Sequence, residues 1–192
     1  MSHIPFSAKA IKLFVERIPS YRDIFAVYGV IVFLVYTWAL YISFYKFPSW
    51  VYYLTVWEIV SVYAYAFTAS LIDSFVVMVV VLSLDFFLFF FFRQMEEAQS
   101  RMILLSVTIL TFIVVRLYLY GGYDDTEVFL STQLIWYWSA IMLGVPLAIV
   151  FSKLSSSRLI VEKIAETLSV FMYVYLPISF VSVAIVLIRN IN

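Results

Sequence analysis

The hydrophobic and polar positions of this chain separate into long segments rather than alternating residue by residue. Six apolar blocks of about 19–23 residues are divided by short joints that hold almost every charge. The blocks cover residues 24–45, 49–71, 74–92, 102–120, 132–152 and 168–188. An α-helix needs about 20 apolar residues to cross a hydrocarbon core of about 30 Å, so each block has the length of a membrane span. The pattern predicts an all-α, polytopic transmembrane helical bundle of about six spans.

The N-terminal segment, residues 1–22, follows a different pattern. Its apolar residues recur at helical spacing, at Ile11, Phe14, Val15 and Ile18. Charged residues lie between them and Pro19 follows, which is typical of an amphipathic helix along the membrane interface rather than of a signal peptide. A partly ordered tail is the alternative interpretation. We therefore predict an interfacial segment over residues 1–22 and a transmembrane domain over residues 23–192.

The joints between the blocks differ in length and chemistry. Residues 46–50 contain Pro48 and predict a tight turn between the first two spans. Residues 71–74 predict an equally short hairpin between the second and third spans, because Asp73 and Ser74 interrupt the apolar run. Residues 153–167 form the longest polar joint, and the spacing of their charged and apolar residues predicts a short amphipathic helix.

The distribution of basic residues does not fix the orientation of six spans. The side that holds the N-terminus would carry five Lys or Arg residues and the opposite side six, too similar for the positive-inside rule to separate. The first span often dominates the orientation of a membrane protein, and this favours a cytoplasmic N-terminus. One alternative removes the conflict. If one of the first three blocks did not cross the membrane fully, the N-terminus and the two basic joints, residues 93–101 and 153–163, would lie on the same side of the membrane.

The composition narrows the possible chemistry. The chain is 65% hydrophobic and 12% charged, has a formal net charge of zero, contains no cysteine and has His3 as its one histidine. These numbers argue against nucleic-acid binding, thiolate chemistry, His- or Cys-based metal sites and a Ser-His-Asp triad. We therefore expect no catalytic residues, no metal site and no cofactor, and we do not expect an enzyme.

Two further biases bear on dynamics and source. Only four glycines are present, whereas transporters that rock and break their helices tend to use Gly and Pro within spans. This favours a static bundle. The scarcity of Cys, Gln and Asn is typical of thermophile proteins and equally of membrane spans in general, so a thermophilic source remains open.

Two carboxylates within the predicted spans are the candidate site. With a hairpin at residues 71–74, Glu58 and Asp85 would lie at a similar depth on antiparallel helices. Thr55 and Ser61 share the Glu58 side of the second span. The four residues predict a proton or cation site, because two desolvated carboxylates share a proton or hold a cation. The alternative is that the acids are protonated and hydrogen-bonded, or neutralised by another subunit.

Arg116 is the third ionisable group inside a predicted span. It precedes Gly121 by a few residues, so its long side chain can reach the headgroup region by snorkelling. An internal ion pair is the alternative.

These features favour a cofactor-free integral membrane subunit or scaffold of a larger membrane complex. Its expected partners are the lipid bilayer and other integral membrane subunits. The alternative is a small ion- or proton-coupled transporter or channel that uses Glu58 and Asp85, and a membrane enzyme ranks third.

Overall fold

The computed structural model describes residues 20–91, 98–120, 126–152 and 155–191, and these ranges hold six helices and no strand. The helices are α2 (Tyr21–Tyr53), α3 (Val56–Phe91), α4 (Ala98–Tyr120), α5 (Thr126–Ser152), α6 (Ser155–Ser169) and α7 (Met172–Ile191). The predicted all-α class is confirmed. Residues 1–19, which carry most of the predicted interfacial segment, lie outside the described residues.

Several of these helices have the length and composition of membrane spans. Within the described ranges, α2, α3, α4 and α7 are long and apolar enough to cross a membrane, and α5 contains a shorter apolar stretch, Ile135–Val150. The protein is therefore a membrane protein with several apolar helices. The predicted arrangement of six separate spans needs correction at two joints.

The first correction concerns the hairpin predicted at residues 71–74. Helix α3 runs through this region without a break and has 36 residues, which is about 54 Å of helix. The segment contains neither Gly nor Pro, and the Ser74 hydroxyl donates to the Leu71 carbonyl (2.7 Å) inside the helix. A single Asp in an apolar run does not by itself end a helix. The second and third blocks are one helix.

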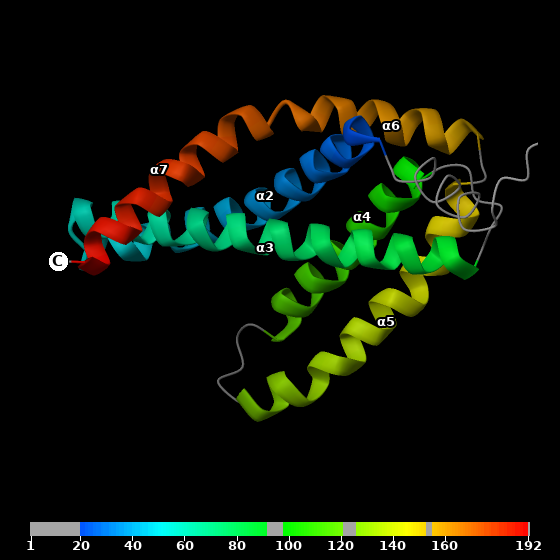
Figure 1. Ribbon diagram of the computed structural model, residues 1–192. Helices are drawn as coiled ribbons and strands as arrows, with labels where there is room; N and C mark the ends of the chain where they lie inside the picture. Colours follow the sequence, from blue (N-terminus) through cyan, green and yellow to red (C-terminus); the bar gives the residue numbers. More distant parts are fainter. Residues whose placement is uncertain (1–19, 92–97, 121–125, 153–154, 192) are drawn as a thin grey trace, which may run out of the picture.

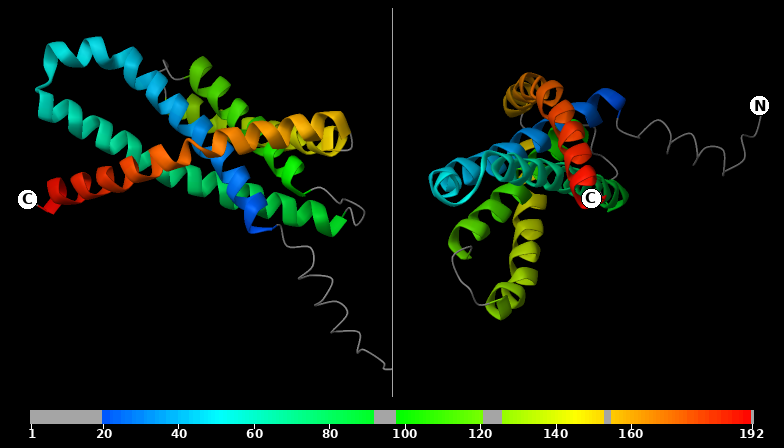
Figure 2. Two further views of the ribbon diagram at one scale, coloured as in Figure 1. Left: turned by 90° about the horizontal axis from the view of Figure 1, so that it is seen from above. Right: turned by 90° about the vertical axis from the view of Figure 1, so that its left-hand side faces the viewer.

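The second correction concerns the turn predicted at residues 46–50. Helix α2 begins with a capping box between Ser20 and Asp23, continues through Pro48 and ends at Tyr53. Proline has no N–H to donate and can bend a helix without ending it. The last turns of α2, in cyan, bend over towards the start of α3 (Figure 2). The connection itself is Leu54 and Thr55.

The helices pack mainly around the first third of α2 and the second half of α3. The main apolar core joins α2, α3 and α4, with Val27, Ile31, Val81, Met102 and Leu105 almost fully buried. Helices α4 and α5 form a hairpin that diverges from α3, while α6 and α7 follow one another along the opposite side of the molecule (Figure 1). The start of α2, the end of α3, the start of α4 and the end of α5 gather towards one end of the molecule.

Hydroxyl groups tie the apolar helices together. Tyr36 of α2 is fully buried and its hydroxyl hydrogen-bonds to the hydroxyl of Ser179 on α7. Tyr28 of α2 pairs in the same way with Ser74 of α3, at 3.1 Å. Buried hydroxyls need such partners in an apolar interior, so these contacts fix how α7 and α3 lie against α2.

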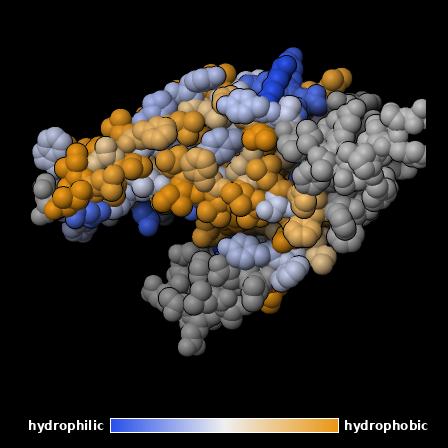
Figure 3. Space-filling model, in the orientation of Figure 1, coloured by the Kyte–Doolittle hydropathy of each residue, from blue (hydrophilic) through white to orange (hydrophobic). Residues whose placement is uncertain are grey.

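Helix α6 confirms the amphipathic helix predicted within residues 153–167. Ala165 is fully buried against the core, while Leu159, Ile160 and Ile164 are more than half exposed. Large apolar side chains are also exposed along α3, α5 and α7. Much of the surface over α3 and the C-terminal part of α7 is hydrophobic in Figure 3. In water such a surface would aggregate, whereas in a bilayer it faces lipid.

Candidate functional site

Glu58 closes the first turn of α3 and is exposed. Its carboxylate accepts hydrogen bonds from the backbone N–H (2.7 Å) and the hydroxyl (2.8 Å) of Thr55, and the Thr55 hydroxyl accepts from the Glu58 N–H (3.4 Å). This is a reciprocal capping box, which satisfies donors that every helix N-terminus leaves free. The structure thus places both residues at the turn between α2 and α3.

The predicted pairing of Glu58 with Asp85 does not occur. Both carboxylates belong to α3 and are 27 positions apart, so about 40 Å of helix separates them. The predicted match in depth depended on the hairpin at residues 71–74, which is absent. Ser61, the fourth residue of the predicted site, donates its hydroxyl to the Trp57 carbonyl (2.8 Å). These residues do not form a common ion site in this structure.

Asp85 instead forms a buried ion pair with Arg101. The Arg101 Nε lies 2.6 Å from Asp85 Oδ1, and the two side chains are 2% and 8% exposed. The residues come from the end of α3 and the first turn of α4, on either side of the connection between these helices. Within the part of the chain that the structure describes, the Arg101 Nη1 is buried without a hydrogen-bond partner. In the sequence, Arg101 lies just before the fourth apolar block, and no feature of that segment indicates a partner on the preceding helix.

Two further contacts bring α6 to the same end of the molecule. The Ser100 hydroxyl donates to Glu162 over 3.4 Å, and Arg22 at the start of α2 pairs with Glu166 at 2.6 Å. The Arg22 and Glu166 side chains are 84% and 55% exposed, so solvent weakens their pair and Asp85–Arg101 is the stronger connection.

Arg116 lies between α4 and α5. It is 5% exposed, and its guanidinium carbon is 6.0 Å from the ring centre of Tyr137. Neighbouring helices cover the side chain, so the snorkelling predicted from the sequence does not describe its position. The contact with Tyr137 has the geometry of a cation–π interaction, which is stronger where water is excluded.

Asp73 is an exposed charged residue far from either end of its helix. It is near the middle of α3 and is exposed, between Ile72, Val76 and Val80, whose exposed fractions are 58%, 56% and 41%. Among the described residues it makes no hydrogen bond and no ion pair. The sequence singled out Asp73 only as a turn residue, because the helix was expected to end there.

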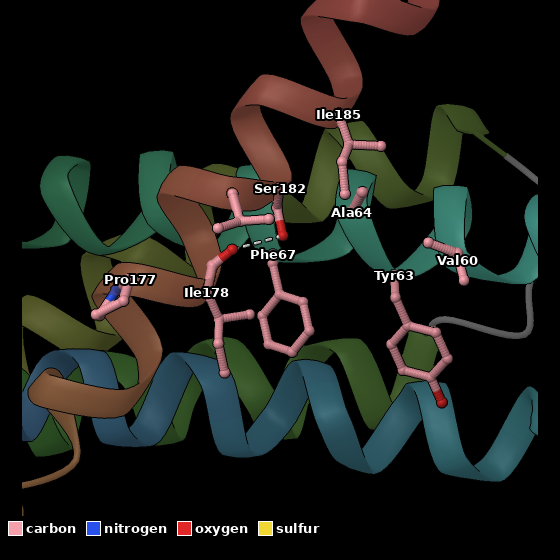
Figure 4. A pocket seen from close by; sticks show the side chains of 9 residues that line it. Val60, Tyr63, Ala64, Phe67, Pro177, Ile178, Ser182 and Ile185 are labelled. Atoms are coloured by element: carbon pink, nitrogen blue, oxygen red, sulfur yellow. Dashed lines mark hydrogen bonds between the residues drawn. The ribbon is translucent and has the colours of Figure 1, made fainter.

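An apolar groove of about 420 Å³ lies between α3 and α7. Tyr63 and Phe67 of α3 face Ile178 and Ser182 of α7 across it, and the Ser182 hydroxyl is bonded to the Ile178 carbonyl (2.8 Å) (Figure 4). The groove therefore offers shape and apolar contact but no acid, base or nucleophile poised for chemistry. Over the ranges that the structure describes, His, Cys, Asp and Glu nowhere gather in a group of three or more.

Comparisons with known proteins do not add to this description. No family model, no curated protein and no solved structure matches the chain.

Proposed function

We propose that the protein is a cofactor-free integral membrane subunit that packs against partner membrane proteins and stabilises a larger complex. The observation that carries this proposal is Asp73, a carboxylate in the middle of a long apolar helix and on its outer face. A charged group in contact with lipid costs at least a few kcal/mol, so such residues usually face protein or a water-filled cavity. A partner on this face of α3 would remove that cost.

The other charged side chains of the helices support a static role. Glu58 caps α3, Asp85 pairs with Arg101, and Arg116 lies between α4 and α5. Each of these contacts holds helices or helix ends in place. The alternative function, ion or proton transport through Glu58 and Asp85, loses its geometric basis because the two carboxylates lie at opposite ends of α3.

The first test is the state of the protein in its own membrane. A tagged chain extracted with a gentle detergent should migrate with other polytopic proteins at fixed stoichiometry in native mass spectrometry. Asp73→Asn should weaken this association, because it removes the charge that needs a partner. Ser83→Asn is the matched control, since Ser83 is also exposed on α3 and its hydroxyl is bonded only to its own helix, at the Val79 carbonyl. A lone monomer or a homo-oligomer would contradict the proposal.

We also propose that the protein lies in the cell membrane with the N-terminal end of α2 on the cytoplasmic side. With α3 continuous, nine of the twelve Lys and Arg residues fall, by their place in the sequence, before or in the first turn of α2, between the end of α3 and the first turn of α4, or from the end of α5 into α6. The helix ends that border these stretches are the ones that gather towards one end of the molecule (Figure 1). The nine residues are Lys9, Lys12, Arg17, Arg22, Arg93, Arg101, Lys153, Arg158 and Lys163. Such an excess is what the positive-inside rule associates with the cytoplasmic side.

This orientation predicts a labelling pattern that is easy to read because the chain has no cysteine. Tyr52→Cys, near the turn between α2 and α3, should react with a membrane-impermeant maleimide in intact cells. Lys163→Cys on α6 should react only after lysis. Both positions are exposed in the structure, so a difference in labelling reports the side of the membrane. The reverse pattern would place the N-terminal end of α2 outside.

A further inference from the structure

We infer that the outer face of α3 around Asp73 docks a transmembrane helix of a different protein, and that this helix carries a lysine or arginine opposite Asp73. The inference rests on the proposed function and specifies the chemistry of the partner.

The position of Asp73 prevents it from reaching the membrane surface along its own helix. It lies near the centre of α3, so about 25 Å of helix extends from it in either direction. Lys and Arg can snorkel over a few ångströms because their side chains are long, whereas the Asp side chain is short. Its charge must therefore be neutralised close to where it is.

The surface around Asp73 is suited to contact with another helix. Ile72, Phe75, Val76 and Val79 are each more than half exposed. The Phe75 ring also contacts Tyr28 of α2, with the ring centres 5.4 Å apart, so the open part of this surface lies on the side of Ile72, Val76 and Val79. This apolar band surrounds one polar group. Helices in membranes associate through van der Waals packing, and hydrogen bonds and charges between them add specificity.

The described side chains of a second copy include no exposed basic residue near the middle of a membrane helix. Among basic residues with described side chains, Arg101 and Arg116 are buried, while Arg22, Lys46, Lys163 and Arg189 are exposed near helix ends or on α6. A two-fold pairing of α3 with α3 would instead bring two carboxylates together, which disfavours ionisation of both. Charge complementarity therefore selects a different protein, with a basic residue near the middle of its transmembrane helix.

The test uses the purified full-length chain in phosphatidylcholine liposomes and synthetic transmembrane helices as probes. One probe is a leucine-rich peptide with a single central lysine, and the matched probes carry leucine or glutamate at that position. A donor dye on Tyr52→Cys and an acceptor dye on the peptide report association by energy transfer. We expect the lysine peptide to bind about tenfold more tightly than the leucine peptide, and the glutamate peptide to bind no better than the leucine peptide.

Two variants assign the preference to Asp73. Asp73→Asn should abolish the preference for lysine, and Ser83→Asn should retain it. Equal binding of the lysine and leucine peptides, or a preference that survives Asp73→Asn, would overturn the inference. Self-association of the chain that excludes the peptides would also overturn it, in favour of a second copy. The native-complex experiment separates the two proposals: stable partners without a lysine preference would reject only the charge pairing.

Discussion

Replacing Asp85 with asparagine is expected to lower the free energy of unfolding by about 3 kcal/mol. The substitution leaves the Arg101 guanidinium buried without its counter-charge, in a site where one of its nitrogens already has no hydrogen-bond partner among the described residues. Breaking a buried pair on one side is costly because the remaining charge stays desolvated. The measurement is equilibrium unfolding of the purified protein in mixed detergent micelles, followed by circular dichroism.

The control is the double variant Asp85→Leu/Arg101→Leu. Removing both charges leaves no uncompensated ion, so the double variant should be clearly more stable than Asp85→Asn. If Asp85→Asn unfolds like the unmodified chain, the pair does not hold α3 and α4 together. A transport role for Asp85 would also predict a different result, namely altered proton or cation flux with stability unchanged.

Replacing Gly29 with alanine is the second change with a large expected effect. A Cβ at Gly29 would lie 2.6 Å from the Ser169 Cα and 3.2 Å from the Ser169 backbone nitrogen, so α2 and α6 would have to separate. Backbone atoms cannot rotate away as the end of a side chain can. Such overpacking typically costs about 1–3 kcal/mol. The same unfolding assay measures it.

Gly144→Ala is the matched control for this second prediction. Its added Cβ would be 3.3 Å from the Thr108 Cγ2, a side-chain methyl group that can yield by a few tenths of an ångström. Both substitutions replace a helical glycine, and both gain up to about 1 kcal/mol of helix propensity. The difference between the two variants therefore isolates the contact between α2 and α6. Equal stability of the variants would contradict the close approach of these helices.

The sequence was informative wherever a single helix decides the outcome. The length of the apolar runs predicted membrane helices, and the spacing of apolar and charged residues within 153–167 predicted α6. Both depend on the composition and periodicity of one segment, which are visible without any neighbour. The two predicted helix ends were wrong because they too relied on local sequence alone. A polar group was expected to end the helix at residues 71–74 and a proline at Pro48, whereas both helices continue through these residues.

The candidate site failed because it depended on the predicted hairpin at residues 71–74. Glu58 and Asp85 were brought together only by the hairpin, so a continuous α3 separates them by about 40 Å. The same continuity favours the alternative left open by the sequence, in which one of the first three blocks does not cross separately. Because α3 is continuous, Asp73 is an exposed charged residue on a helix face rather than a residue of a turn.

By itself, the sequence determined that this protein is helical and belongs in a membrane, because apolar length and the cost of exposed backbone groups leave few alternatives to helices. Only the tertiary structure decided which charges meet. Asp85 and Arg101 lie on different helices, and whether they form a pair depends on how those helices end and pack. Asp73 remains outside for the same reason, since a side chain is buried or exposed only with respect to its neighbours.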